Sequence, residues 1–246
     1  SRILSVGTYR PKRVVPNSEI VDRIDSTDEW IVQRTGIESR RFAGDDETVI
    51  SMAKAACEIA LKRAKLTIAD IDTVILSTIS YPFQAPSAAT ELINELGNPK
   101  AAAFDISAAC AGFCYGVAMG SDLVRSGTSK NVLVIGVEKL SDYTDPDDRA
   151  TAFIFADGAG AVVIGQSDQP RIGQTIWGSD ADSRDAITLT PSFLDFKKNP
   201  DKGVGELGWP NISQQGQVVF RWAVYSMSKV GLKALEAAGV SVDELG

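Results

Sequence analysis

Apolar residues recur at intervals of three and four along several stretches of the chain, which is the spacing of one helix face. In the stretch 47–65, Val49, Met52, Ala53 and Ala56 begin such a stripe. Capping residues or a following glycine bound most of these stretches. We therefore predict helices over 27–37, 47–65, 87–96, 112–124 and 218–238, and a further capped helix start at Asn17.

Short apolar runs lie between the predicted helices. Thr73–Thr78 and Asn131–Val137 contain few polar side chains, as expected of strands buried on both faces. Ile3–Thr8 and Ala101–Ile106 are further strand candidates, and Ala152–Gly165 has the pattern of a turn into a strand. Strands that alternate with helices indicate an α/β fold with a largely parallel central sheet.

The chain changes character after Gln166. Polar residues dominate 167–211, although Arg171–Trp177 and Ala186–Leu189 have the composition of strands. Leu194–Gly208 carries three lysines and several glycines, which predicts a mobile surface loop.

Two segments far apart in the chain are similar. Leu66–Ile71 and Val240–Leu245 each follow an alanine-rich helix and combine apolar with acidic residues. A buried strand follows the first copy, whereas the sequence stops just after the second. The similarity indicates an internal repeat whose second copy is unfinished.

Charge and composition exclude several classes of protein. The 246 residues carry a formal net charge of -7 without a basic stripe, which argues against a nucleic-acid-binding surface. No run approaches the ~20 apolar residues of a membrane span, and the first apolar run is too short for a signal peptide. Three cysteines without paired spacing favour a reducing cytoplasm over a disulfide framework or a zinc site.

Cys110 is the strongest candidate nucleophile. It lies between a predicted strand and a predicted helix, among the small residues of Ala108–Gly112. Free N–H groups and the helix dipole at such a junction favour a thiolate, and small neighbours let a substrate carbonyl approach. The alternative is a buried structural cysteine. The sequence contains no histidine, the commonest general base, so thiol chemistry needs another activator or residues outside this sequence.

Trp30 and Arg34 are one helical turn apart, so together they can stack on a base and bind a phosphate. The alternative is a core tryptophan and a solvated arginine. The acidic run at 141–149 lacks the spacing of a calcium loop, and the glycines at 158–160 lack the third glycine of a dinucleotide fingerprint.

Four motifs together resemble those of β-ketoacyl-acyl carrier protein synthase III, the initiating condensing enzyme of type II fatty acid synthesis. They are Thr27–Ile31 with Arg34–Ile37, Ala108–Phe113, Asp145–Pro146 with Asp148–Arg149, and Phe155–Ala161. The resemblance extends in order over essentially the whole chain. It implies a thiolase-like fold of two similar βα halves stacked as layered sheets and helices. Residues 1–166 are then the half that carries the nucleophile, and residues 167–246 begin an incomplete second half.

The resemblance also implies roles for single residues. Cys110 matches the nucleophile that accepts the acyl group of a short acyl-CoA, before malonyl-acyl carrier protein decarboxylates and attacks it. Trp30, Arg34, Arg149 and Phe220 match residues that bind coenzyme A, Thr35 is a plausible neighbour of that site, and Ala85 matches the cap of the partner subunit's acyl pocket. A homodimer without a cofactor or metal is implied.

Two departures from the family pattern stand out. The histidine and asparagine that complete the family's triad have no counterpart, because they are expected just after Gly246. Ala85 replaces a bulky phenylalanine, although Phe83 lies close enough to make that alignment ambiguous.

Three functions therefore stay open. The first is the condensing enzyme described above. The second is another enzyme of the superfamily, a synthase of secondary metabolism or a 3-hydroxy-3-methylglutaryl-CoA synthase. The third is a non-catalytic chain that binds a carrier protein or a partner synthase, which the missing histidine favours if the protein truly ends at Gly246.

Overall fold

The computed structural model describes residues 1–245, and the chain forms two compact units. The first unit comprises Ser1–Val15, Arg40–Ser141 and Ala156–Ile172. The second comprises Pro16–Ser39, Asp142–Phe155 and Gly173–Gly246, of which the final residue lies outside the described range. The division into 1–166 and 167–246 stays a prediction.

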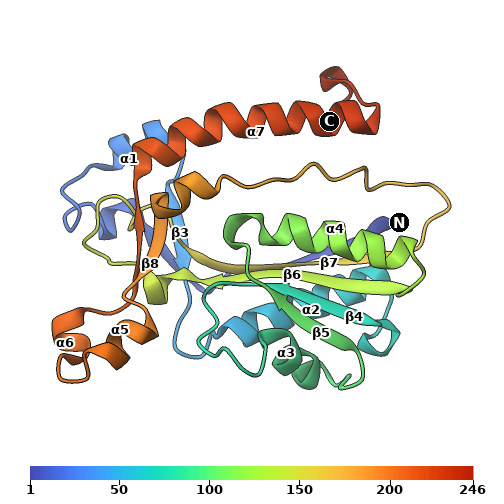
Figure 1. The fold of residues 1–246 in the computed structure, drawn as a ribbon, viewed down its shortest axis with the longest axis horizontal. Coiled ribbons are helices and arrows are strands. Elements are labelled where there is room, and N and C mark those ends of the chain that lie inside the picture. The colour runs from blue at the N-terminus through green and yellow to red at the C-terminus, as the bar shows by residue number, and fades with distance from the viewer. Residues whose placement is uncertain (246) are drawn as a thin grey trace. The chain divides into compact units, whose positions relative to one another are not determined.

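A five-stranded sheet forms the centre of the first unit (Figure 1). In spatial order its strands are β1 (Arg2–Tyr9), β7 (Asp157–Gly165), β6 (Asn131–Lys139), β4 (Thr73–Ser77) and β5 (Ala102–Ile106). β4 pairs in parallel with β5 and β6, whereas β7 pairs antiparallel with both β6 and β1. Since β7 alone opposes the direction of the other four strands, the predicted, largely parallel sheet is confirmed.

Helices cover both faces of this sheet (Figure 1). α2 (Val49–Ala64) and α3 (Ala88–Leu96) pack on one face, and α4 (Gly112–Arg125) packs on the other. Successive side chains of β4 point to opposite faces, so Val74 and Leu76 join the core under α2 and α3, while Ile75 joins the core under α4. All five residues of β4 are buried. This burial explains why the sequence of the strand is a nearly continuous apolar run.

Three glycines let α4 approach the sheet closely. A Cβ atom at Gly116 would lie 2.7 Å from Val134 Cγ1, and one at Gly120 would lie 3.1 Å from Ile164 Cδ1. At Gly112 it would lie 1.8 Å from Ser77 Oγ, at the end of β4. The spacing of four residues places these glycines on one helix face, so the start of α4 is held directly against the end of β4.

The second unit contains four α-helices and a two-stranded antiparallel sheet within the described residues. They are α1 (Asp28–Thr35), α5 (Phe193–Lys198), α6 (Gly203–Leu207) and α7 (Gly216–Ala238), with strands β8 (Ile187–Thr190) and β9 (Asn211–Gln214). α1 begins where Thr27 Oγ1 accepts the Trp30 N–H at 3.2 Å, and it ends at Gly36, whose φ is +71°. The predicted start and glycine stop of this helix are thus confirmed.

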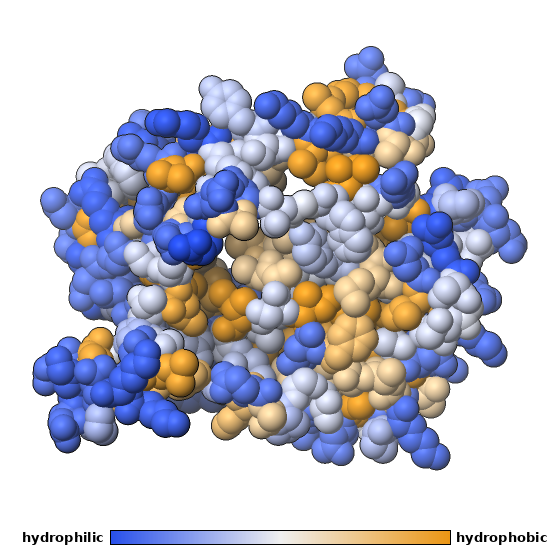
Figure 2. Space-filling view, in the orientation of Figure 1, coloured by the Kyte–Doolittle hydropathy of each residue, from blue (hydrophilic) through white to orange (hydrophobic). Residues whose placement is uncertain are grey.

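α7 exposes apolar side chains along its length (Figure 2). None of its residues is buried in the part of the chain that the structure describes. The more exposed of its large apolar side chains are Phe220, Tyr225, Met227 and Leu232.

Three local predictions were wrong. Leu194–Gly208 is not simply a loop, because α5 begins at a capping box formed by Ser192 and Asp195, and α6 follows. Arg171–Trp177 is not a strand; the Arg171 N–H donates to the Ser1 carbonyl, but no ladder of pairs follows among residues 1–245. Asn17 begins only a 3-10 turn, since its side-chain amide donates to Asp28 and Ile37 instead of capping a helix.

A short two-stranded sheet of β2 (Arg13–Pro16) and β3 (Ser39–Phe42) was not predicted. Its strands have four residues each and carry arginines, so they lack the apolar runs by which longer strands were recognised.

The internal similarity is confirmed locally. α2 and α7 each end at a residue in the left-handed region, Lys65 with a φ of 57° and Gly239 with a φ of 65°. A 3-10 turn with a capping box follows in both places, at Ile68–Asp70 and at Val242–Glu244. The two similar segments therefore adopt the same local structure.

Candidate active site

Cys110 lies at the edge of the sheet where the parallel strands end. β5 finishes at Ile106, and the chain passes through a 3-10 turn, Ala109–Ala111, into α4. Cys110 is exposed in this turn, which confirms its predicted place between a strand and a helix. The first N–H groups of a helix and its dipole favour negative charge there, so the turn suits a thiolate nucleophile.

Ala109 has an uncommon backbone conformation. Its φ is +43°, a region that residues with a Cβ atom enter at a cost of roughly 1–2 kcal/mol. Strain of this kind is often found at functional sites, where the surrounding structure enforces it. Here Ala109 directly precedes the candidate nucleophile and produces the sharp turn between β5 and α4.

The three cysteines have different environments. Cys57 is fully buried in the core under α2, and burial raises the pKa of its thiol. Cys110 and Cys114 are both exposed, and Cys114 lies in the first turn of α4. Cys57 is therefore a structural residue, while Cys110 and Cys114 are accessible thiols.

The loop after β4 reaches the same edge as Cys110. β4 and β5 are parallel neighbours, and Ser77 at the end of β4 contacts Gly112 at the start of α4. Ala85 is exposed in the middle of this loop, and Phe83 is 61% exposed. The sheet topology thus places the start of this loop and the turn of Cys110 at the same end of the sheet.

In the second unit, Trp30 is the centre of a cluster of planar groups. The guanidinium carbon of Arg34 lies 4.8 Å from the centre of the Trp30 ring, and that of Arg149 lies 5.3 Å from it. Phe153 contacts the same ring edge-on, with 5.5 Å between ring centres. Three residues predicted from distant motifs are thus brought together, and two cations face one aromatic surface.

Acidic side chains position the segment that carries Arg149. Arg23 and Asp147 form a bidentate ion pair, with Nε–Oδ1 at 2.7 Å and Nη2–Oδ2 at 3.0 Å, and the guanidinium lowers the pKa of Asp147. Arg149 donates to the Asp25 carbonyl. The acidic run around Pro146 is therefore explained in part by pairing with arginine.

The Thr35 hydroxyl forms hydrogen bonds at the end of α1. Its Oγ1 donates to the Ile31 carbonyl at 2.8 Å and accepts the Ile37 N–H at 3.1 Å. Because its single hydroxyl hydrogen is engaged, a ligand would meet its methyl group or a remaining lone pair.

Phe220 lies on α7 and is 70% exposed. It lines a hollow of about 320 Å³ together with Gln217, Arg221, Val224 and Tyr225. An aromatic side chain beside aliphatic and polar neighbours suits a flexible, partly polar ligand chain.

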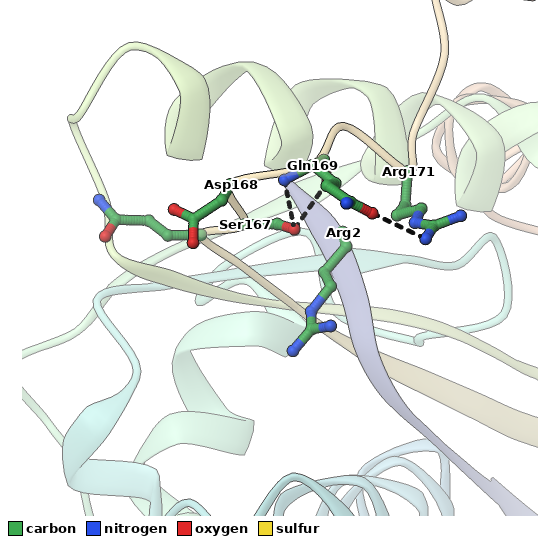
Figure 3. A pocket seen from close by; sticks show the side chains of 6 residues that line it. Arg2, Ser167, Asp168, Gln169 and Arg171 are labelled. Atoms are coloured by element: carbon green, nitrogen blue, oxygen red, sulfur yellow. Dashed lines mark hydrogen bonds between the residues drawn. The ribbon is translucent and has the colours of Figure 1, made fainter.

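The first unit also has a polar hollow of about 400 Å³ (Figure 3). Arg2, Gln166, Ser167, Asp168, Gln169 and Arg171 line it. Arg2 in β1 pairs with Gly165 in β7, and Gly165 also pairs with Asn131 at the start of β6. The hollow therefore lies where β6 begins, whereas Cys110 lies at the opposite edge, where the parallel strands end. Arg171 Nη2 donates to Gln169 Oε1 at 2.9 Å, so polar groups of the hollow partly satisfy one another.

Residues 1–245 show neither a membrane-spanning helix nor a metal-binding cluster. No helix there is both long and apolar enough to cross a membrane. No group of three or more His, Cys, Asp or Glu side chains in the same range is arranged to hold a metal ion.

The sequence is similar to one protein family throughout. Residues 104–181 match the family described as 3-oxoacyl-[acyl-carrier-protein (ACP)] synthase III. Over 250 residues the chain is 52% identical to β-ketoacyl-[acyl-carrier-protein] synthase III 1 of Streptomyces coelicolor, in a match that covers 100% of this chain and 73% of that relative. It is 47% identical over 243 residues to the synthase III of Mycobacteroides abscessus, covering 99% of this chain and 71% of that one.

Solved structures give the same result. The priming β-ketosynthase of the R1128 polyketide biosynthetic pathway is 42% identical with a TM-score of 0.94, and the match covers 99% of this chain and 72% of that one. The 3-oxoacyl-[acyl-carrier-protein] synthase III of Aquifex aeolicus is 36% identical with a TM-score of 0.81, over 99% of this chain and 74% of that one.

Proposed function

The chain belongs to the β-ketoacyl-[acyl-carrier-protein] synthase III family, and from this premise we propose which of its residues act on the substrates. The fold is thiolase-like, and the protein is an acyltransferase that initiates fatty acid synthesis. It joins an acyl-CoA primer to malonyl-acyl carrier protein in a decarboxylative condensation.

Cys110 is the residue that accepts the acyl group. Its thiolate attacks the thioester carbonyl of acyl-CoA, a carbon–sulfur bond forms, and coenzyme A leaves as a thiol after taking up a proton. The small residues around Cys110 leave room for the carbonyl, and its own N–H supplies one donor to the oxyanion. The single observation that carries this assignment is an exposed thiol in the turn Ala109–Ala111, between the end of β5 and the start of α4.

The condensation follows on the acylated cysteine. Malonyl-acyl carrier protein loses carbon dioxide, and the resulting carbanion attacks the acyl carbonyl. The bond to Cys110 breaks, so the thiolate is regenerated and the β-ketoacyl group leaves on the carrier protein.

Trp30, Arg34 and Arg149 bind the nucleotide end of coenzyme A. Two arginines can pair with phosphates, and the tryptophan offers a face on which adenine stacks. A base between Trp30 and a guanidinium needs about 7 Å, twice the optimal carbon–carbon separation of about 3.5 Å. Since Arg34 and Arg149 lie 4.8 and 5.3 Å from the ring centre, one of them moves outward by about 2 Å when the base enters.

Three further residues complete the proposed site. Phe220 lines the path of the pantetheine arm, and Thr35 borders the nucleotide through its methyl group. Ala85 caps the acyl pocket of the partner subunit in a homodimer. Its single methyl group leaves room for primers longer or more branched than acetyl. The proposed reaction needs no cofactor or metal, and we assign it to the cytoplasm.

Mass spectrometry of the full-length protein tests the central step. After incubation with acyl-CoA, the protein should gain the mass of one acyl group, and Cys110→Ala should gain none. Cys114→Ala is the matched control, because it removes the other exposed thiol and should still be acylated. An acyl adduct that persists in Cys110→Ala and disappears in Cys114→Ala would refute the assignment.

A priming synthase of polyketide assembly is the second candidate. The TM-score of 0.94 to the R1128 priming β-ketosynthase supports it. The two functions differ in the carrier protein that supplies the malonyl group. Turnover with carrier proteins of fatty acid and of polyketide synthesis, compared at equal acyl-CoA, separates them.

A further inference from the structure

We propose that a clasp of three residues holds Arg149 beside Trp30 and thereby favours binding of the nucleotide of acyl-CoA. The clasp consists of the positioning residues Arg23, Asp25 and Asp147, none of which belongs to the motifs that resemble the family. The inference rests on the proposed function of Trp30 and Arg149 in binding coenzyme A.

The two arginines that face the Trp30 ring come from different kinds of segment. Arg34 lies on α1 together with Trp30, so the helix itself fixes the distance between them. Arg149 lies within 144–156, which consists of turns, bends and irregular backbone. Its place 5.3 Å from the centre of the ring therefore depends on contacts with other segments.

Two contacts join this segment to the residues just before α1. Arg23 and Asp147 form a bidentate ion pair, with N–O distances of 2.7 and 3.0 Å. Arg149 donates to the Asp25 carbonyl, and its Nη1 also lies 3.9 Å from the Asp25 carboxylate. Both contacts join residues 124 positions apart, so the two stretches lie side by side and run in the same direction.

The two stretches are complementary in charge. Arg23 and Asp25 on one side meet Asp147 and Arg149 on the other, so each arginine contacts an aspartate. An exposed ion pair contributes little to stability, but a bidentate pair of arginine and carboxylate fixes orientation as well as distance. The clasp therefore orients the segment of Arg149 more than it stabilises the fold.

Asp25 has a backbone conformation that suits this contact. Its φ is +47°, in the left-handed region, which aspartate enters more readily than most residues. The Ser26 N–H donates to the Val21 carbonyl at 3.0 Å and closes the turn. The uncommon conformation thus lies at the residue whose carbonyl binds Arg149, as expected where the surrounding structure enforces a conformation for function.

Loss of the clasp should weaken binding only of substrates that carry the nucleotide. Asp147→Asn and Arg23→Gln in the full-length enzyme each break the bidentate pair, so the segment of Arg149 must be ordered again when substrate binds. The readout is kcat/KM for butyryl-CoA divided by kcat/KM for butyryl-pantetheine, which has the same thioester without the nucleotide. Either change should lower this ratio about fivefold, through a higher KM for butyryl-CoA.

The backbone of Asp25 is tested by two substitutions. Asp25→Val places a β-branched residue at a positive φ and should displace the carbonyl that binds Arg149. Asp25→Gly keeps this conformation accessible and removes only the carboxylate. The ratio should therefore fall further in Asp25→Val than in Asp25→Gly.

Glu95→Gln is the matched control. It removes an exposed ion pair with Lys54, in which the N–O distance is 3.3 Å, from the first unit. Its ratio should stay within about twofold of the wild type. An equal fall in Glu95→Gln would overturn the inference, because the loss of any surface ion pair would then suffice.

Arg149→Ala distinguishes a failure of the inference from a failure of the proposed function. If Arg149→Ala lowers the ratio while the variants at Arg23 and Asp147 do not, the clasp is overturned and the nucleotide site stands. If Arg149→Ala itself leaves the ratio unchanged, the proposed role of Arg149 in binding coenzyme A is refuted.

Discussion

Glu47 is an almost buried carboxylate, 5% exposed, that joins three segments of the first unit. It accepts the Gly44 N–H at 2.9 Å, the Lys12 N–H at 3.1 Å and the Tyr9 hydroxyl at 2.5 Å. These contacts lower the pKa of Glu47, chiefly through the Gly44 N–H and then the Tyr9 hydroxyl. One charge therefore connects the end of β1, the following residues and the turn before α2.

We expect Glu47 to make the free energy of unfolding depend on pH in acid. Because the pKa is depressed on folding, the stabilisation is fully present above the ordinary value of 4.5 and is lost as the pH falls through the lower folded value. Glu47→Gln should reduce stability at neutral pH and flatten this acid loss, as measured by urea unfolding from about pH 7 to pH 3. Glu58→Gln, on the exposed side of α2, is the control, and an unchanged acid slope in Glu47→Gln would contradict the assignment.

Single residues were predictable where a motif carried them. Cys110, Trp30, Arg34 and Arg149 all come from motifs with recognisable spacing. The positive φ of Ala109 has no signal in the sequence, because alanine is not a residue that prefers that region. Its conformation belongs to the turn between β5 and α4, which only the tertiary structure defines.

At the level of elements, α4 depends on its glycine stripe. Gly116 faces Val134, a stiff β-branched side chain in a buried strand, so added atoms cannot be accommodated by a rotamer change. The closeness of α4 to the sheet therefore requires small residues at these positions.

Gly116→Val should lower the free energy of unfolding by about 1–3 kcal/mol, the usual cost of overpacking a core. Gly160→Val in β7 is the comparison, because no atom lies within 4 Å of a Cβ built there and valine favours strands. That change should leave stability within about 0.5 kcal/mol of the wild type. Chemical denaturation measures both, and equal losses in the two variants would argue against close packing at Gly116.

Long helices and buried strands were predictable from the regular spacing of their apolar residues, whereas short helices were not. The helix over 47–65 buries apolar residues at helical spacing, and the strand that begins at Thr73 buries a nearly continuous apolar run. α5 and α6 have six and five residues and bury none, so their formation depends on caps and local turns instead. The contacts of the clasp were also missed, since they join residues 124 positions apart in the sequence.

At the scale of the whole molecule, the residues of the proposed site are divided between the two units. The thiol and the loop 78–87 belong to the first, and the Trp30 cluster belongs to the second. Binding of the nucleotide and reactivity of the thiol are therefore expected to respond separately to mutation.

Trp30→Ala in the full-length enzyme tests this separation. Loss of the aromatic face should raise KM for acyl-CoA by about tenfold, corresponding to about 1.4 kcal/mol of binding. Alkylation of Cys110 by iodoacetamide should stay at the wild-type rate, and Trp30→Phe should recover part of the affinity. A fall in kcat with KM unchanged would show that Trp30 acts on the chemical step instead.

The reversed strand β7 has a consequence for the order of folding. β1 pairs with β7, and its register joins Arg2 to Gly165, so β1 must wait for a partner that is synthesised much later. Pairing over such a separation closes a long loop and is intrinsically slow. β4, β5 and β6 have nearer partners and can associate before β7 is available. During synthesis β1 is thus expected to join a preformed parallel core last, together with β7, as the step that completes the sheet.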